Sequence, residues 1–266
     1  MINCGIYPDT VFLNTIMSNL CKEGRAIEAK NIFDLILHVG AKPDVVSYNI
    51  LIDGYCLCGK MDEAIKLLAS MVSNGLQPDS VTYGTLLNGY CKNGRIDDGL
   101  ALFREMLSKD VKPDIITYNI LLQGLFQAGK TVAAEELYLM MIDSGIRLYM
   151  ATYNIILGGL CKNNYVDDAL IMFRSLCSED FQLSVISFNI IIDALRKAGR
   201  KKEAMDMFAS ISANNLVPNA VSYTLMMENL IDEGLLEESD VCLMFLICFW
   251  PWRRLDVLQP HVCLML

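Results

Sequence analysis

The chain carries ten cysteines, the side chains best suited to redox or metal chemistry. Four of them recur at spacings of 35 or 70 residues: Cys21, Cys56, Cys91 and Cys161. Cys56 and Cys58 have no second cysteine or histidine cluster at the spacing of a zinc site, and only two histidines, His38 and His261, are present. We therefore interpret the periodic cysteines as reduced thiols in a repetitive core and expect neither a metal site nor a cofactor.

Pairs of adjacent acids also recur, and paired carboxylates could act as a general acid and a general base. The pairs are Asp62–Glu63, Asp97–Asp98 and Asp167–Asp168. Each pair opens a stretch with helical periodicity, where the helix dipole favours negative charge. Stabilisation of a helix start explains the acids without catalysis, so we expect that the chain is not an enzyme. Catalytic carboxylates are the alternative interpretation.

The elements that carry these residues repeat every 35 residues, a period marked by Pro8, Pro43, Pro78 and Pro113 and continued by Leu148, Leu183 and Pro218. Within residues 45–79, apolar side chains form two separate stripes with the spacing of an α-helix. Each stripe predicts a helix of about 13 residues, which is marginal alone and needs neighbours. The pattern therefore predicts an all-α fold, an α-solenoid of 35-residue helix-turn-helix repeats.

Two turns per repeat carry residues that tolerate a left-handed backbone after a helix. The first turn has Gly24, Gly59, Gly94, Gly129, Asn164, Gly199 and Gly234, and the second has Gly5, Gly40, Gly75, Asp110, Gly145, Asp180 and Asn215. The predicted repeats are 10–44, 45–79, 80–114, 115–149, 150–184 and 185–219. Residues 1–9 end a truncated repeat, 220–240 form a partial seventh, and 241–266 form an atypical hydrophobic tail.

The charge balance raises a question about partners. A net charge of −9 argues against a nucleic-acid partner, because binding to phosphates needs a basic surface. Lysines nevertheless share one repeat position, at Lys22, Lys92, Lys162 and Lys197, so an acidic solenoid can have a basic groove. The alternative is that these cations complement helix C-termini. The apolar run Val241–Trp250 is ten residues long, too short for a membrane span.

The repeat consensus separates this chain from other repeats of similar length. It contains V-[ST]-Y-N, G-[YL]-C-K-x-G-[RK], D-[DE]-[AG] and a final P-D, and residues 45–79 show nearly all of it. The tetratricopeptide Trp and the ankyrin T-P-L-H turn are absent from the repeats. From residue 1 to about 239 the chain closely resembles the pentatricopeptide repeat family, and within it the P class and the restorer-of-fertility-like branch of plants.

This resemblance implies a right-handed superhelix that binds single-stranded RNA, one base per repeat, in organelle transcript processing or fertility restoration. The full-length family member would be mitochondrial, although no targeting peptide is visible here. A nuclease or another processing factor is an expected partner, whereas a membrane and a small-molecule substrate are not. A protein-interaction solenoid, an RNA endonuclease and a truncated non-functional copy remain alternatives.

In that family the fifth and last residues of each repeat select the base, and the second residue clamps it. The base-selecting pairs would be Asn14 with Asp44, Asn49 with Asp79, Gly84 with Asp114, Asn119 with Tyr149, Asn154 with Ser184, and Asn189 with Asn219. The clamping residues would be Val11, Val46, Val81, Ile116, Ala151 and Ile186. Family members meet phosphate where this chain has Lys22, Lys92, Lys162 and Lys197.

The residue types suit that chemistry. An Asn amide both donates and accepts, and a companion Asp adds an acceptor for the N–H of uracil. Gly84 has no side chain and Tyr149 is atypical, so their repeats should read poorly. Read from the N-terminus along 5′ to 3′ RNA, the family code predicts a pyrimidine-rich target, 5′-UUNYCY-3′. The alternative is that the asparagines are polar residues on an exposed helix surface.

Overall fold

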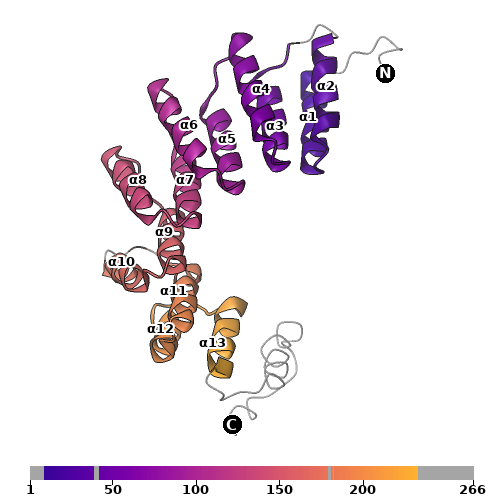
Figure 1. The fold of residues 1–266 in the computed structure, drawn as a ribbon. Coiled ribbons are helices and arrows are strands. Elements are labelled where there is room, and N and C mark those ends of the chain that lie inside the picture. The colour runs from indigo at the N-terminus through magenta and orange to yellow at the C-terminus, as the bar shows by residue number, and fades with distance from the viewer. Residues whose placement is uncertain (1–8, 39–41, 179–180, 182, 233–266) are drawn as a thin grey trace, which may run out of the picture. The chain divides into compact units, whose positions relative to one another are not determined.

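A computed structural model describes residues 9–38, 42–178, 181 and 183–232 (Figure 1). Those residues form thirteen α-helices of 13 residues each, without a strand. The helices are α1 (Thr10–Lys22), α2 (Ala26–His38), α3 (Val45–Leu57), α4 (Met61–Ser73), α5 (Ser80–Lys92), α6 (Ile96–Ser108), α7 (Ile115–Gln127), α8 (Thr131–Asp143), α9 (Met150–Lys162), α10 (Val166–Ser178), α11 (Val185–Lys197), α12 (Lys201–Ala213) and α13 (Ala220–Asp232). The predicted all-α fold of helix-turn-helix repeats is confirmed. The predicted tail 241–266 and the turn residues Gly5, Gly40, Asp180 and Gly234 lie outside the described residues.

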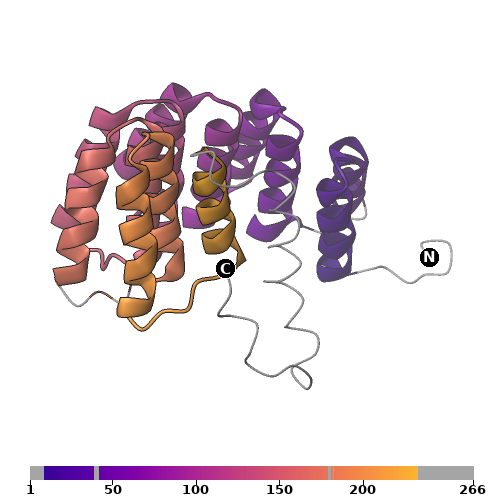
Figure 2. The same cartoon turned by 90° about the horizontal axis from the view of Figure 1, so that it is seen from below.

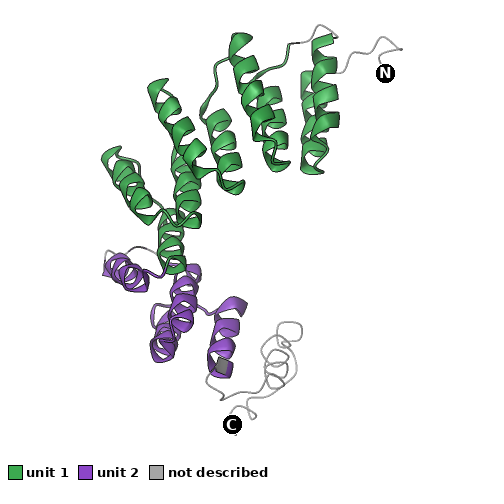
Figure 3. Cartoon of the chain, viewed as in Figure 1, with its two compact units in different colours: residues 1–163 green, residues 164–266 purple. Residues whose placement is uncertain are grey.

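The chain divides into two compact units, residues 1–163 and 164–266 (Figure 3). In the first unit, the first helices α1, α3, α5, α7 and α9 pack on one another in chain order. The second helices α2, α4, α6 and α8 lie beside them as an outer layer (Figures 1 and 2). In the second unit, α11 packs against α10, α12 and α13. Each repeat thus contributes one helix to each layer.

The turns have the predicted left-handed backbone wherever they are described. Gly59, for example, has a φ of +71° and follows the C-cap of α3. The N–H of Lys60 donates to the carbonyl of Tyr55 at 2.8 Å, and the N–H of Gly59 donates to that of Cys56 at 3.1 Å. These bonds satisfy the last carbonyls of the helix and turn the chain toward α4. Asp110, Asn164 and Asn215 take the same conformation without a glycine.

Aromatic pairs join the second helix of one repeat to the first helix of the next. The rings of Phe33 and Tyr48 meet edge to face with centroids 5.0 Å apart, and those of Phe103 and Tyr118 do so at 5.6 Å. Tyr48 is almost completely buried. Such pairs add stabilisation beyond their buried area. They place the core between repeats as well as within them.

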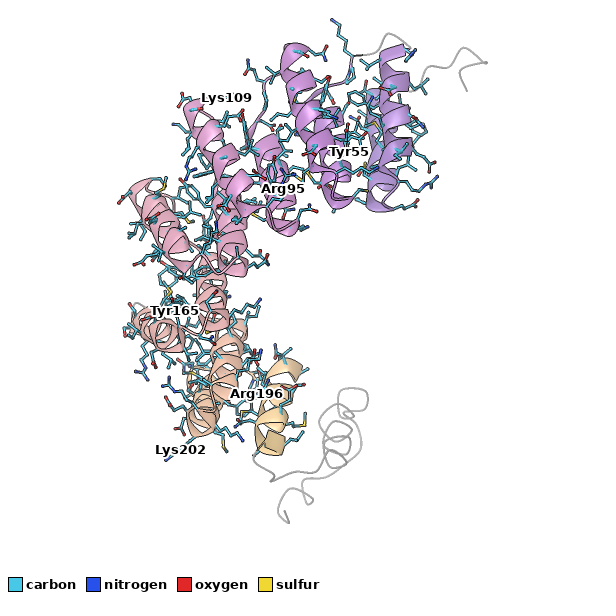
Figure 4. All side chains as sticks on the ribbon, in the orientation of Figure 1. Tyr55, Arg95, Lys109, Tyr165, Arg196 and Lys202 are labelled. Atoms are coloured by element: carbon cyan, nitrogen blue, oxygen red, sulfur yellow. The ribbon has the colours of Figure 1, made fainter. Side chains whose placement is uncertain are left out.

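The acid pairs occupy the first turns of second helices, as predicted from the helix dipole. They also pair with cations of the following repeat: Arg95 with Asp62 and Lys130 with Asp97 in the first unit, and Arg200 with Asp167 in the second. Arg95 lies at the turn between α5 and α6 (Figure 4). Ion-pair formation between neighbouring repeats therefore gives these acids a structural role, although each exposed pair contributes little stability.

In the first unit, successive first helices approach so closely that one position has no room for a side chain. A Cβ atom built on Gly54 would lie 2.3 Å from the Sγ of Cys21, and one on Gly89 would lie 2.5 Å from the Sγ of Cys56. Burial raises the pKa of the Cys21 thiol to about 11 and that of Cys56 to about 12. The predicted burial is confirmed for Cys21 and Cys56, whereas Cys91 and Cys161 are half-buried. The thiols of Cys21 and Cys56 each fill the space over a glycine of the next repeat.

Adjacent glycines in α9 provide a test of this close approach. A Cβ on Gly159 would lie 2.2 Å from Cγ of Phe126, whereas one on Gly158 would meet no atom within 4 Å. We expect Gly159→Ala to lower the free energy of unfolding by about 1–3 kcal/mol through overpacking. Gly158→Ala should be neutral or stabilising by roughly 1 kcal/mol, because alanine favours a helix. Urea denaturation of both variants checks this, and equal effects would contradict the packing argument.

Candidate nucleic-acid interface

The last residue of a repeat caps the first helix of the next repeat. The carboxylates of Asp44, Asp79 and Asp114 each accept the backbone N–H of the third residue of the following helix, at 2.8 Å. Asp9 caps α1 in the same way, at 2.7 Å. An N-cap of this kind is worth about 1 kcal/mol. The recurring Asp therefore has a structural role in addition to any role in binding.

The structure brings the fifth and last residues of a repeat together with a hydroxyl of the next repeat. In the first repeat, the Oγ of Ser47 lies 2.8 Å from both Oδ1 of Asn14 and Oδ1 of Asp44. The Nδ2 of Asn14 faces Oδ1 of Asp44 at 3.4 Å. We call these three positions, the fifth and last residues of one repeat and the third residue of the next, the amide cluster.

The second repeat has the same amide cluster. The Oγ1 of Thr82 lies 2.8 Å from Oδ1 of Asn49 and 2.8 Å from Oδ1 of Asp79. In the second unit, the Oγ of Ser222 donates to Oδ1 of Asn189 at 2.7 Å, and Nδ2 of Asn189 donates to Oδ1 of Asn219 at 3.1 Å. The predicted base-selecting pairs of these repeats are thus neighbours in space, and a hydroxyl completes each pair.

Two repeats lack one member of the cluster. Gly84 supplies no amide, although Thr117 still donates to Asp114 at 2.8 Å. In the next repeat, Tyr149 stands in place of the acid. There, Oδ1 of Asn119 and Oγ1 of Thr152 are both buried without a hydrogen-bond partner. The amide and the hydroxyl of this repeat are therefore not bonded to each other, unlike those of the repeats that end in Asp44, Asp79 or Asn219.

The remaining predicted pair, Asn154 and Ser184, belongs to two different units, and each residue is described within its own. Asn154 is half-buried on α9. Ser184 precedes α11, with its hydroxyl 3.4 Å from that of Ser187. Ser184 does not form the side-chain cap that Asp44 forms on α3.

The acids of complete clusters are ionised at neutral pH. Partial desolvation raises the pKa of Asp79, but hydrogen bonds from the backbone and hydroxyl of Thr82 and from Asn49 outweigh it and hold the pKa below its ordinary value of 3.8. The same balance lowers the pKa of Asp44, through Ser47 and Asn14. Each carboxylate therefore only accepts hydrogen bonds. Because Asp44 and Asp79 are exposed, that acceptor is accessible to a ligand.

The amides themselves are less exposed than a helix-surface position would be. Asn14 and Asn189 are 7% and 8% exposed, and Asn49, Asn119 and Asn154 are half-buried. Asn14 and Asn189 each bond a hydroxyl of the next first helix, with part of the amide used inside the cluster. These two amides are therefore not on an exposed surface, whereas Asn49, Asn119 and Asn154 are partly exposed.

The predicted clamping residues are exposed apolar side chains. Val11, Val46, Val81, Ile116 and Ile186 are between 55% and 73% exposed, and Ala151 is exposed too. Each lies three residues before a fifth-position residue and so shares its helix face. In the first unit, an aliphatic side chain is thus left in water at the same place in each repeat, an arrangement suited to contact with a ligand.

The predicted phosphate-contacting lysines are exposed in the last turns of α1, α5, α9 and α11. Their positive charge is partly opposed by nearby acids. Lys197 forms an ion pair with Asp193 at 2.6 Å. Asp53 is half-buried, which raises its pKa, while the charges of Lys92 and Lys22 act to lower it. The basic groove expected from sequence therefore also contains carboxylates at the ninth position of two repeats.

The role of the hydroxyl in the amide cluster was not predicted from sequence. The hydroxyl residues occupy the second position of the V-[ST]-Y-N motif, at Ser47, Thr82, Thr117, Thr152, Ser187 and Ser222. All six side chains are buried. Because the partner amide lies 33 residues earlier, the motif alone does not indicate the contact.

The described part of the chain contains no group of three or more His, Cys, Asp or Glu residues that could hold a metal ion. Among the described helices, none has the length and apolar character needed to cross a membrane.

Solved structures with the same fold include pentatricopeptide repeat proteins. PPR10 from maize has a TM-score of 0.65 at 18% identity, with 94% of this chain and 40% of PPR10 covered. PPR10 in complex with an 18-nt psaJ RNA element has a TM-score of 0.59 at 23% identity and covers 89% of this chain and 40% of its own. The PPR domain of Arabidopsis thaliana protein-only RNase P 1, in complex with tRNA, has a TM-score of 0.54 at 16% identity, covering 69% and 97%.

This chain therefore spans about two fifths of the PPR10 chains that it matches. A comparison with curated protein sequences gives no match. The model of the PPR repeat family matches six overlapping segments, 8–57, 43–92, 78–127, 113–162, 149–197 and 183–232. These segments include all thirteen helices. The chain belongs to the PPR repeat family.

Proposed function

We propose that the chain binds single-stranded RNA along its first helices, with one base per repeat. The observation that carries the proposal is the recurrence of the amide cluster beside an exposed aliphatic side chain. Hydrogen-bonding groups could read a base edge while the aliphatic row covers the base faces. Complexes of PPR10 with an RNA element and of a PPR domain with tRNA support this function.

Base selection follows from the charge of the last residue. The ionised Asp44 and Asp79 accept hydrogen bonds, so they favour the N3–H of uracil over the bare N3 acceptor of cytosine. Asn219 is neutral and can serve either pyrimidine. With Gly84 and Tyr149 weakening two repeats, the preferred RNA is 5′-UUNYCY-3′.

The clamping residues Val11, Val46, Val81, Ile116, Ala151 and Ile186 contact the faces of successive bases. Lys22, Lys92 and Lys162 contact phosphates, and Lys197 does so in competition with Asp193. The net charge of −9 limits nonspecific attraction to RNA. Hydrogen bonds and stacking therefore carry more of the affinity than charge does.

In the cell, we place the chain in the P class and the restorer-of-fertility-like branch of plants, acting on a mitochondrial transcript. The uniform 35-residue period and the consensus motifs support this placement. The chain acts as a binding module rather than as an enzyme. It covers part of the RNA, changes its folding or recruits a nuclease or another processing factor.

RNA binding can be tested by gel shift with 5′-UUNYCY-3′ RNA and a purine-substituted version. We expect the pyrimidine RNA to bind at least about tenfold more tightly, because each bidentate base contact is worth about 1–3 kcal/mol. Four phosphate contacts, at about −0.7 each, give an expected slope of about −3 when the logarithm of the binding constant is plotted against the logarithm of the salt concentration. Equal affinity for both RNAs would contradict base reading, and ribonuclease-insensitive capture of a protein instead would favour a protein-interaction solenoid.

The two roles of Asp79 can be separated by substitution. Asp79→Asn keeps an N-capping side chain but removes the charge, so the preference for uracil over cytosine at the second base should fall with little change in stability. Asp79→Ala should also lose about 1 kcal/mol of stability with the cap. Competition binding with the two RNAs, together with urea denaturation, measures both effects. If Asp79→Asn kept the full preference for uracil at the second base, the carboxylate would not be the group that selects the base.

The third repeat allows a gain of function. A Cβ on Gly84 would lie 3.9 Å from Oγ1 of Thr117, its nearest neighbour, so an amide fits beside Asp114. We expect Gly84→Asn to create a uracil preference of about tenfold at the third base, where the unmodified chain has none. Gly84→Ala is the control for improved helix stability, and it should show no preference at the third base. Binding to RNAs that differ only at the third base measures the result, and a similar gain in both variants would refute the assignment.

A further inference from the structure

The hydroxyl of the amide cluster has one proton and two acceptors within reach. Thr82 is completely buried, so its proton has to be donated inside the cluster. The Oδ1 of Asp79 lies 2.8 Å from the hydroxyl, and it also accepts the backbone N–H of Thr82 at 2.8 Å. The Oδ1 of Asn49 lies 2.8 Å from the hydroxyl, in position to accept its proton. Ser47 has the same arrangement toward Asn14 in the first repeat.

This contact determines which way the amide faces. An ionised carboxylate repels an oxygen, so the amide group facing the acid has to be the Nδ2. In the first repeat, Nδ2 of Asn14 indeed faces Asp44 at 3.4 Å, while its Oδ1 faces Ser47. A flipped amide would place its own oxygen against the oxygen of the acid and would lose the bond from the hydroxyl. The acid and the hydroxyl therefore hold the amide in one orientation.

An amide in this orientation presents a defined pattern to a ligand. Its Oδ1 is held by the hydroxyl, and its Nδ2 keeps a proton to donate beside the second oxygen of the acid. A donor next to an acceptor matches the O4 and N3–H edge of uracil. Free rotation of the amide would blur that pattern, because the flipped form presents an acceptor in place of the donor.

The fourth repeat lacks the bond between the amide and the hydroxyl. It has the amide of Asn119 and the hydroxyl of Thr152, but Tyr149 replaces the acid. In that repeat the amide oxygen and the hydroxyl are both buried and unpartnered. The same two groups are hydrogen-bonded wherever Asp44 or Asp79 supplies the acid.

We propose that the Ser or Thr at the third position of a repeat is a positioning residue for the base read by the preceding repeat. Ser47, Thr82 and Ser222 hold the amides of Asn14, Asn49 and Asn189. Each base site is then built from three residues and two consecutive repeats. This inference rests on the proposed RNA-binding function.

The test uses the full chain with Thr82→Val and Thr82→Ser. Valine has nearly the shape of threonine without the hydroxyl, and serine keeps the hydroxyl. We measure the preference for uracil over cytosine at the second base, with the preference at the first base as an internal control. Thr82→Val should reduce the second-base preference about tenfold, the effect of one hydrogen bond, and leave the first-base preference unchanged. Thr82→Ser should retain both.

Each other outcome has a definite meaning. If the unmodified chain prefers uracil and Thr82→Val does too, the positioning role is overturned and the proposed function stands. If Thr82→Val weakens binding to every RNA equally, Thr82 is only structural and the inference also fails. If the unmodified chain shows no RNA binding or no base preference, both the inference and the proposed function fall.

A gain-of-function comparison guards against a variant that fails to fold. Tyr149→Asp restores the missing acid, so Asn119 and Thr152 should form a complete cluster and create a uracil preference of about tenfold at the fourth base. The double variant Tyr149→Asp with Thr152→Val should show no such gain. An equal gain in both variants would overturn the role of the hydroxyl.

Discussion

The close approach of successive first helices is the constraint on which the other features depend. Gly54 and Gly89 have no room for a Cβ atom, because Cys21 and Cys56 of the preceding repeat occupy that space. At this separation a short hydroxyl can bridge two helices, as Thr82 does to Asn49 at 2.8 Å. One inserted residue would rotate the rest of a helix by about 100° and separate these groups. The constant 35-residue period is therefore a geometric requirement.

The acid at the end of each of the first three repeats illustrates how one residue can serve both structure and recognition. Asp79 starts α5 by accepting a backbone N–H, and the same oxygen takes part in the amide cluster. Helix capping alone would explain its recurrence, since Asp9 caps α1 beside Phe12, which has no hydroxyl. What capping does not explain is the convergence of an amide and a hydroxyl on the same carboxylate.

The period, the helices and the left-handed turns could all be predicted from sequence, because each depends on residues close together in the chain. Gly59 and Asn164, for example, follow helix ends that their own repeats define. The burial of Asn14 and the role of Ser47 could not, because each depends on a helix 33 residues away and on its distance. The pairing of Lys197 is different, because Asp193 lies only four residues earlier on the same helix and such a pair can be predicted from sequence.

The distribution of charge follows from the same two-layer arrangement. Arg95 and Lys130 form ion pairs with acids of the preceding repeat, so these cations help to join the outer layer. An acidic chain of this kind gains little from long-range attraction to phosphate. Selectivity has to come from short-range contacts of fixed geometry. An amide held between an acid and a buried hydroxyl provides such a contact, since its orientation is set before any ligand arrives.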